Sequence, residues 1–365
     1  MGIHYYSLTD HLLVLSQISI SNLRNISELT FQPAQGINLI LGENGAGKTS
    51  ILEAIHLLGL GRSFKARTLK SAIKFGENQL QVIAKTSKHT PVGVQFNDRS
   101  GLTIRLNSAP LKRLSDLAMQ LPLQFIPANC HQFFEQGPRY RRQLLDWGLF
   151  HVEPSFNFHW QSYKKILQQR NSAIRQHKKI EEIQLWDNHL AEHGEKVTAL
   201  RCKQLDIILD VFEDIFQRLC PEYSNAKFAI KYRTGWNKEK DLKTSLLDAL
   251  ERDRNLGYTR SGSHAADWSI SINDHNPAEV FSRGQQKLFF LALCMAQAKI
   301  TEHIRHEESI LLLDDISSEL DLAHQKNVLN ELTTLPVQAF ITATDPSLES
   351  YEKATVFHVE RGAIL

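Results

Sequence analysis

The sequence lacks the features that mark secreted or membrane proteins. Its 4 cysteines lie far apart and form no Cys-x-x-Cys pair, so neither a disulfide framework nor a cysteine zinc site is expected. It contains no run of about 18 apolar residues, the length that a membrane-spanning helix requires. Residues 1–10 lack the basic and apolar regions of a secretory signal, so none is expected there. These absences predict a cytoplasmic protein with buried thiols.

The net charge is also small, at +2, but the charges are unevenly distributed. Residues 61–74 contain five Lys or Arg and no acid, and residues 138–180 contain nine basic and two acidic residues. Residues 181–222 reverse this balance, with ten acids and four basic residues. Such blocks are typical of solvated surfaces, but two basic blocks also suit the phosphate backbone of a nucleic acid.

One short stretch is more specific than these bulk properties. It fits the phosphate-binding pattern G-x-x-x-x-G-K-[ST] and comprises Gly42, Glu43, Asn44, Gly45, Ala46, Gly47, Lys48 and Thr49. The apolar run at 36–41 predicts a strand before it, and the spacing at 50–58 predicts a helix after it, as the motif requires. The glycines and the helix start form an anion site. Lys48 is predicted to reach the β- and γ-phosphates of ATP, and Thr49 to bind Mg²⁺.

Two adjacent acids provide the second part of a nucleotide site. Residues 309–313 form an apolar run that predicts a buried strand, and Asp314 and Asp315 follow it directly. A carboxylate at this end of a strand lies where ligands collect in an α/β sheet. Asp314 is predicted to hold Mg²⁺ through water, and Asp315 to orient or deprotonate the attacking water.

The periodicity predicts an α/β head assembled from both ends of the chain, with a mainly helical lobe inserted between them. The 365 residues leave room for two domains. We place the head at 1–128 and 276–365 and the lobe at 129–275, with an antiparallel helical hairpin or small bundle over 156–218. Strands are predicted at 12–20, 29–31, 36–41, 79–86, 91–97, 102–106, 121–126, 226–233, 267–273, 309–313, 339–344 and 355–359, and further helices at 241–254 and 287–298.

A third motif narrows the class of ATPase. Residues 281–286, Phe-Ser-Arg-Gly-Gln-Gln, resemble the Leu-Ser-Gly-Gly-Gln signature of ABC-type ATPases. Ser282, Gly284 and Gln285 keep its functional positions, at the start of a predicted helix where an anion site forms. The resemblance implies an ABC-type P-loop ATPase head with a mixed sheet. It also implies that this signature caps the γ-phosphate held by a second subunit.

The same resemblance assigns roles to other positions. Residues 317–321 resemble the D-loop that crosses the subunit interface. Gln124 stands where the family's Q-loop glutamine approaches Mg²⁺ and water, so it is implied to contribute to the metal and catalytic site. Thr344 stands where transporters carry a switch histidine.

Several further stretches resemble the RecF family of bacterial recombination mediators, in the family's order and over nearly the whole chain. They are residues 22–25, 61–64, 121–124, 137–147, 256–260, 282–286 and 313–315. The resemblance implies an SMC-like ATPase that forms ATP-dependent homodimers on DNA and hydrolyses ATP slowly. It also implies a role with RecR and RecO in loading RecA at single-strand gaps. The chain departs from the family's pattern at Ser263 and Ala265, which replace Pro and Arg, and residues 1–10 precede that pattern as a predicted loose extension.

Basic residues from both positive blocks are candidate DNA contacts. They are Arg62, Lys65, Arg139, Arg141 and Arg142. No base-reading motif is visible, so we expect contacts to the backbone of duplex DNA and of gap junctions. For the three arginines, the structural alternative is pairing with acids of a neighbouring helix.

Two other functions would share parts of this pattern. The nucleotide-binding subunit of an ABC transporter has the same loop, signature and acids, but the separation between Gln124 and Ser282 is too long for its compact helical subdomain. A non-catalytic adaptor could keep a vestigial site. The intact loop lysine and paired acids argue against that alternative.

Overall fold

The computed structural model describes residues 14–365, so the extension predicted at residues 1–10 lies outside the described part. The chain divides into two compact units. The head unit contains residues 218–220, residues 287–365 and the described part of residues 1–130. The second unit contains residues 131–217 and 221–286. The boundaries thus lie near 130 and 286, whereas the sequence placed them at 128 and 275.

A six-stranded sheet of mainly parallel strands forms one layer of the head, in the order β14-β13-β3-β12-β11-β8. Every residue of β3, β11 and β12 is buried, which explains why these strands are continuous apolar runs. The predicted strands at these positions are confirmed. The strands are β3 (Ile37–Leu41), β8 (Leu123–Ile126), β11 (Ser309–Leu313), β12 (Val337–Ala343), β13 (Ala354–Glu360) and β14 (Ala363–Ile364).

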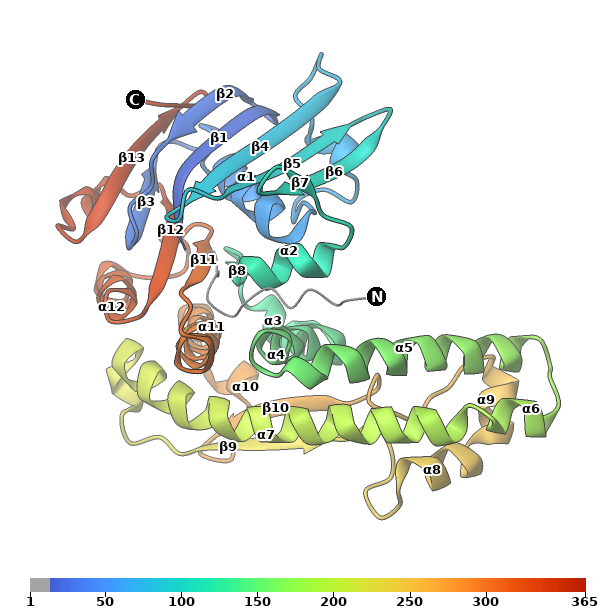
Figure 1. Cartoon of the computed structure of the whole chain (residues 1–365). Helices are drawn as coiled ribbons and strands as arrows, with labels where there is room; N and C mark the ends of the chain where they lie inside the picture. Colours follow the sequence, from blue (N-terminus) through green and yellow to red (C-terminus); the bar gives the residue numbers. More distant parts are fainter. Residues whose placement is uncertain (1–13) are drawn as a thin grey trace. The chain divides into compact units, whose positions relative to one another are not determined.

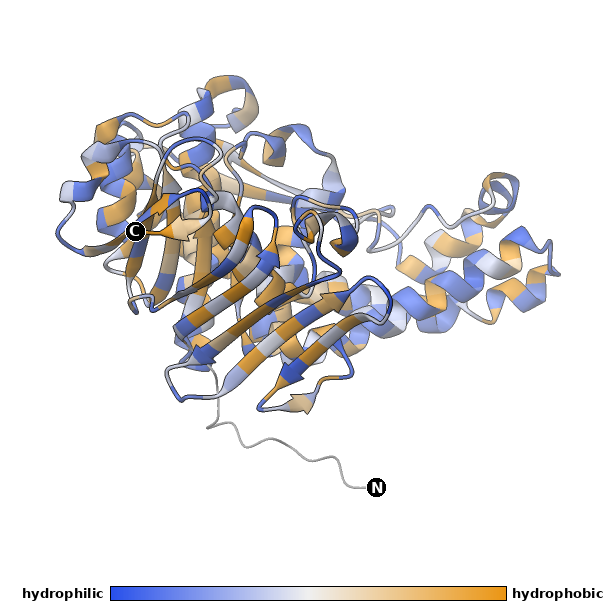
Figure 2. Cartoon of the chain, turned by 90° about the horizontal axis from the view of Figure 1, so that it is seen from above, coloured by the Kyte–Doolittle hydropathy of each residue, from blue (hydrophilic) through white to orange (hydrophobic). Residues whose placement is uncertain are grey.

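An antiparallel sheet forms a second layer, in the order β2-β1-β4-β5-β6-β7. Hydrophobic and hydrophilic residues alternate along its strands, as expected for a sheet with one buried face (Figure 2). The predicted side sheet is confirmed, and the structure adds the first two strands to it. The strands are β1 (Leu15–Leu23), β2 (Ile26–Phe31), β4 (Gln79–Thr86), β5 (Pro91–Asn97), β6 (Gly101–Leu106) and β7 (Ala109–Pro110).

Helix α1 (Lys48–Leu60) shares one hydrophobic core with both sheets (Figure 1). Its Ile51 belongs to the same buried cluster as Val82 of β4 and Phe340 of β12. Buried residues occur around the whole helix, and Glu53 is among them. A helix is buried on all sides when other elements enclose it. This packing fixes the start of α1, which carries the phosphate loop.

The remaining head elements are short, apart from one long helix. Within residues 14–365, no helix combines the length and the hydropathy needed to cross a bilayer. Helix α11, predicted at 287–298, begins earlier and ends later than expected. The elements are η1 (Leu69–Ala72), α2 (Leu114–Gln120), α11 (Arg283–Arg305), α12 (Leu322–Leu332) and η3 (Pro346–Ser350).

The second unit is built on helices α5 (Pro154–Arg175) and α7 (Asp187–Leu219), which run antiparallel and confirm the predicted hairpin (Figure 1). Tyr163 of α5 is fully buried among apolar side chains. The helix predicted at 241–254 is instead two short helices that meet at Ala249. The other elements are α3 (Gln132–Glu135), α4 (Pro138–Val152), α6 (Ile180–Gln184), η2 (Pro221–Tyr223), β9 (Phe228–Arg233), α8 (Leu242–Asp248), α9 (Leu250–Leu256), β10 (Asp267–Ile272) and α10 (Pro277–Val280).

Candidate nucleotide-binding site

The phosphate loop joins the end of β3 to the start of α1 in the head unit. Gly47 precedes α1 with a φ of 117°, a left-handed value that favours glycine. At Gly42, a Cβ atom would lie 2.3 Å from the carbonyl oxygen of Val359, so a larger residue does not fit. Both glycines are therefore required by the backbone. The loop turns directly into a helix N-terminus, where N–H groups without helical partners form an anion site.

The side chain of Lys48 folds back onto this loop. Its Nζ donates hydrogen bonds to the carbonyl oxygens of Gly42 at 2.6 Å and Glu43 at 2.8 Å. Burial lowers the pKa of Lys48, and the charges of Asp315 and Asp314 partly oppose this shift. Among the described residues Lys48 forms no ion pair with either acid, and its hydrogen-bond acceptors are backbone carbonyls.

The predicted magnesium ligands lie side by side. Thr49 Oγ1 donates to Asp314 Oδ1 at 3.0 Å, and Thr342 Oγ1 donates to the same oxygen at 2.9 Å. Mg²⁺ prefers hard oxygen ligands and usually keeps several of its waters. A hydroxyl from α1 and a carboxylate from the end of β11 therefore fit Mg²⁺ as its few protein ligands.

Asp315 directly follows Asp314, in a turn whose backbone conformation is constrained. Its φ is 50°, a left-handed value that is uncommon outside glycine. The backbone N–H of Asp315 donates to Thr342 Oγ1 at 2.8 Å. Its Oδ1 atom is buried and has no hydrogen-bond partner within residues 14–365. Buried polar atoms normally have partners, so this carboxylate oxygen is available to a water or a ligand.

Gln124 lies on β8, where it pairs with Leu311 of the adjacent β11. Its Nε2 donates to Gln297 Oε1 at 2.7 Å. Its own Oε1 is buried and, in the described chain, has no hydrogen-bond partner. Among the described residues, no hydrogen bond joins Gln124 to either of the two acids. Its approach to Mg²⁺ and water stays a prediction.

Asn25 supports the phosphate loop, a role that the sequence did not reveal. Its Nδ2 donates to the carbonyl oxygens of Gly45 and Ala46 at 3.4 and 3.3 Å, and its Oδ1 accepts from Ser50 Oγ at 3.0 Å. The N–H of Gly362 also donates to Ala46 at 2.7 Å. The stretch 22–25, which resembles the family's pattern, was the available signal for this role. The sequence could not show the contacts of Asn25, because the residues that it contacts lie elsewhere in the chain.

The motifs at 22–25 and 61–64 meet on α1 through Glu53. Arg24 donates two hydrogen bonds of 2.8 Å to the fully buried carboxylate, and the bond to Glu53 raises the pKa of Arg24. Ser63 Oγ also donates to Glu53. The flanking Arg62 and Lys65 are exposed. Their contact with DNA stays a prediction.

A cavity of about 570 Å³ opens beside the phosphate loop. Its lining combines residues 41–46 with residues 358–361 at the end of β13 and with Leu365. This volume lies within the range typical of small-molecule sites. The loop therefore borders a space large enough for part of a nucleotide.

The signature residues lie at the start of α11 and belong to the second unit. The N–H of Gln285 donates to Ser282 Oγ at 3.3 Å, and the N–H of Ser282 donates to Gln285 Oε1 at 3.0 Å. This reciprocal pair is a capping box, and Gly284 lies within its turn. Ser282 is exposed at the N-terminus of a long helix, where an anion is favoured. Contact with another subunit's nucleotide stays a prediction.

The three candidate arginines of α4 differ in their contacts. Arg141 donates to Asp267 at 2.8 and 3.0 Å, and Arg142 donates to the carbonyl oxygen of Ala266. These contacts favour the structural alternative for both arginines, although the partners lie at the start of β10 and not on a helix. Arg139 is exposed and has no ion pair in the described part of the chain. Its contact with DNA stays a prediction.

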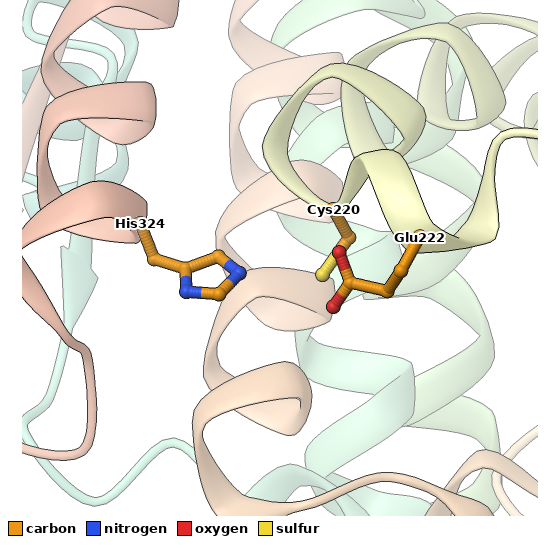
Figure 3. Close-up of side chains that lie close together, drawn as sticks. All are labelled: Cys220, Glu222 and His324. Atoms are coloured by element: carbon orange, nitrogen blue, oxygen red, sulfur yellow. The ribbon is translucent and has the colours of Figure 1, made fainter.

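Potential metal ligands of the head unit outside this site include Cys220 and His324. Cys220 is buried, and His324 lies in the first turn of α12 (Figure 3). His324 Nδ1 lies 3.0 Å from Asp321 Oδ1, which also caps α12.

Comparisons with known proteins agree along nearly the whole chain. The family model RecF/RecN/SMC N terminal domain matches residues 14–363. The DNA replication and repair protein RecF of Nitrosococcus oceani is 37% identical over 359 residues, which cover 96% of this chain and 98% of that protein. The protein of the same name from Shewanella denitrificans is 36% identical over 357 residues, with coverage of 96% and 98%.

Solved structures show the same relationship. The recombination mediator protein RecF-ATP in the RecFOR pathway has a TM-score of 0.82 at 26% identity, covering 100% of this chain and 99% of that chain. An Smc head bound to the C-winged helix domain of ScpA has a TM-score of 0.60 at 14% identity, covering 96% of each chain, which shows a shared fold alone. The predicted ABC-type ATPase head is thereby confirmed, and a transporter subunit is not favoured. The chain belongs to the RecF family.

Proposed function

We propose that the chain is an ATP-dependent DNA-binding protein of recombinational repair. ATP binding drives dimerisation on DNA, and slow, DNA-stimulated hydrolysis reverses it. Together with RecR and RecO, the protein helps to load RecA at single-strand gaps in the cytoplasm. The observation that carries the proposal is the 3.0 Å contact between Thr49 and Asp314, in a chain 37% identical to a DNA replication and repair protein.

ATP is the proposed ligand of the phosphate loop. Lys48 exchanges its carbonyl acceptors in the loop for the β- and γ-phosphates, whose charge matches the ammonium better. The N-terminus of α1 contributes N–H donors to the same phosphates. Thr49 and Asp314 would hold Mg²⁺, which would neutralise phosphate charge. The ATP named for a structural relative supports this choice of nucleotide.

Asp315 is the proposed general base or orienting group for the attacking water. Its unpartnered Oδ1 can accept a hydrogen bond from that water. Thr342 supports the geometry, because its hydroxyl contacts both Asp314 Oδ1 and the N–H of Asp315. Gln124 is proposed to break its hydrogen bond with Gln297 and to turn its amide toward Mg²⁺ and the attacking water.

Dimerisation is proposed because the signature caps a nucleotide in a second subunit throughout the ABC class. The exposed capping box of Ser282 and Gln285 is available to such a partner. Each phosphate loop would then form half of a composite site. Bound ATP would hold two subunits together, whereas ADP, which lacks the γ-phosphate, would not.

The proposed DNA contacts are made by exposed cations of both units. Arg62 and Lys65 follow α1, and Arg139 lies in the first turn of α4. These side chains would contact phosphates and would not read bases. Such binding weakens steeply with salt, because each contact releases counterions from the DNA.

The decisive experiment is a DNA-binding titration with ATP, with ADP and without nucleotide, each at two salt concentrations. We expect the tightest binding with ATP and weaker binding at higher salt. Sedimentation with saturating ATP and Mg²⁺ should show a dimer. Lys48→Ala should abolish ATP binding and the dimer, whereas Lys112→Ala, an exposed lysine of the same unit, should change neither. A monomer under these conditions would contradict the dimer, and equal DNA binding with ATP and ADP would contradict the nucleotide switch.

A further inference from the structure

Lys287 is a buried lysine to which the proposed chemistry assigns no role. It lies near the start of α11, after the capping box, and is 2% exposed. Its Nζ donates to the carbonyl oxygens of Asp315 and Ser318, both at 2.7 Å. A buried ammonium requires good acceptors, because an unpaired charge is costly away from water. The two carbonyls are therefore specific partners of this lysine.

These carbonyls belong to the turn that carries the proposed base. Asp315 has a φ of 50° there, so its backbone must be held in place by its neighbours. Thr342 holds one part of the turn, because its hydroxyl accepts from the N–H of Asp315 and its carbonyl accepts from Ile316 at 3.0 Å. Lys287 holds the carbonyl groups of the same turn. Because the Asp315 side chain extends from this backbone, the lysine helps to fix the direction of its carboxylate.

We propose that Lys287 is a positioning residue for hydrolysis, which acts by holding the turn that aims Asp315 at the attacking water. The inference rests on the proposed ATPase function and extends it. Lys287 and the signature cap at Ser282 also lie at the same end of α11. The lysine therefore attaches the turn of the base to the helix that begins at the signature.

The first test compares the Lys287→Met variant with the wild-type protein, both at full length. Methionine keeps the unbranched shape but removes the charge and the donors. ATP affinity and the ATP-dependent dimer should stay within about 3-fold, while kcat should fall by about 10–100-fold, because small displacements of a catalytic group have effects of this size. Lys299→Met is the matched control, since Lys299 is exposed on the same helix, and its rate should be unchanged.

A double variant distinguishes positioning from a general loss of structure. If Lys287 acts through Asp315, Lys287→Met combined with Asp315→Asn should hydrolyse ATP no more slowly than Asp315→Asn alone. Multiplied losses, or a wild-type rate for Lys287→Met, would overturn the proposal. Should Lys287→Met not fold, the same cycle applies to Lys287→Arg, which keeps the charge but changes the donor geometry. A wild-type protein that neither binds ATP nor dimerises would instead count against the proposed function.

Discussion

The second unit and the nucleotide site of the head use buried charge in opposite ways. In the second unit, the fully buried Arg170 donates to Asp187, Asp253 and Thr259, each at 2.7 Å. Arg201 follows the same pattern, because it donates two hydrogen bonds of 2.8 Å to the carboxylate of one aspartate and is also fully buried. Each arginine therefore has its counter-charge inside the unit.

The nucleotide site of the head keeps its opposite charges apart, although ion pairs such as Arg24–Glu53 occur elsewhere in the same unit. Lys48 donates to backbone carbonyls, and Asp314 accepts from hydroxyls. The Oδ1 atom of Asp315 has no partner among residues 14–365. Leaving charges unpaired costs stability, whereas pairing them satisfies the fold but leaves little for a ligand. The comparison indicates that the second unit uses these charges for structure, whereas the nucleotide site reserves its charges for phosphate and metal.

The largest expected effect tests the unpaired carboxylate of the nucleotide site. Asp315→Asn should slow ATP hydrolysis by about 10²–10⁴-fold, the usual contribution of a general base, while ATP binding and the dimer persist. Its thermal melting temperature should not fall, because the carboxylate has no ion pair to lose. Asp116→Asn, an exposed acid of the head, is the control for hydrolysis and melting. A large loss of stability in Asp315→Asn would show that its charge serves the fold.

The next largest effect is expected for Arg170, whose charge is paired with two buried acids of the second unit. Arg170→Met should lower the free energy of unfolding by about 3–5 kcal/mol, because it leaves two buried acids without their partner. Burial already raises the pKa of Asp187 and Asp253 despite the arginine beside them. Denaturant unfolding measures the loss, and Lys165→Met, an exposed lysine of the same helix, should change it by less than about 0.5 kcal/mol. ATP binding measured below the melting temperature should be unchanged, and its loss would contradict the division of roles.

Acid should weaken both units through buried neutral histidines. Burial lowers the pKa of His56 in the head to about 4, and it also lowers the pKa of His264 in the second unit. The unfolded histidine, with a pKa of about 6.5, binds protons more readily, so the stability is present above pH 6.5 and is lost as the pH falls toward 4. For His56 alone the loss between pH 7 and pH 5 should be about 2 kcal/mol.

Urea unfolding at the two pH values measures this loss. His56→Gln should reduce the difference between pH 7 and pH 5, because glutamine can still donate to the carbonyl oxygen of Arg62, which His56 Nδ1 contacts at 2.7 Å, but does not titrate. If the variant showed the same pH dependence as the wild type, His56 would not be the group responsible.

These tests also mark what could be predicted from the sequence. The phosphate loop, the acids at 314 and 315 and most strands were predictable, because each depends on neighbours along the chain. The contact of Asn25 with the loop and that of Lys287 with the turn at Asp315 were not, because each joins segments far apart in the sequence. Thr342 illustrates the same limit. The sequence marked only Thr344, which stands where transporters carry a switch histidine and is exposed, whereas Thr342 contacts Asp314 in the fold.

The arginines of α4 show why surface charge is hard to predict from sequence. The sequence left two interpretations open for the three arginines, contact with DNA or pairing with acids of a neighbouring helix. The helix starting at Pro138 is a local feature, but the position of Asp267 beside Arg141 depends on how β10 folds back. Sequence therefore identifies which residues are charged, and only the fold shows which charges are already neutralised.

The smallest expected effect separates the charges of this cluster. Arg139→Ala should weaken DNA binding by about 2–5-fold and reduce the slope of log affinity against log salt by about 0.9, the contribution of one phosphate contact. Arg141→Ala should leave that slope unchanged, because Asp267 already neutralises the guanidinium, and should instead destabilise the second unit. Fluorescence anisotropy across a salt series measures both slopes. Equal reductions would mean that DNA competes successfully for a paired arginine, and pairing within the fold would then not predict which charges are reserved for a ligand.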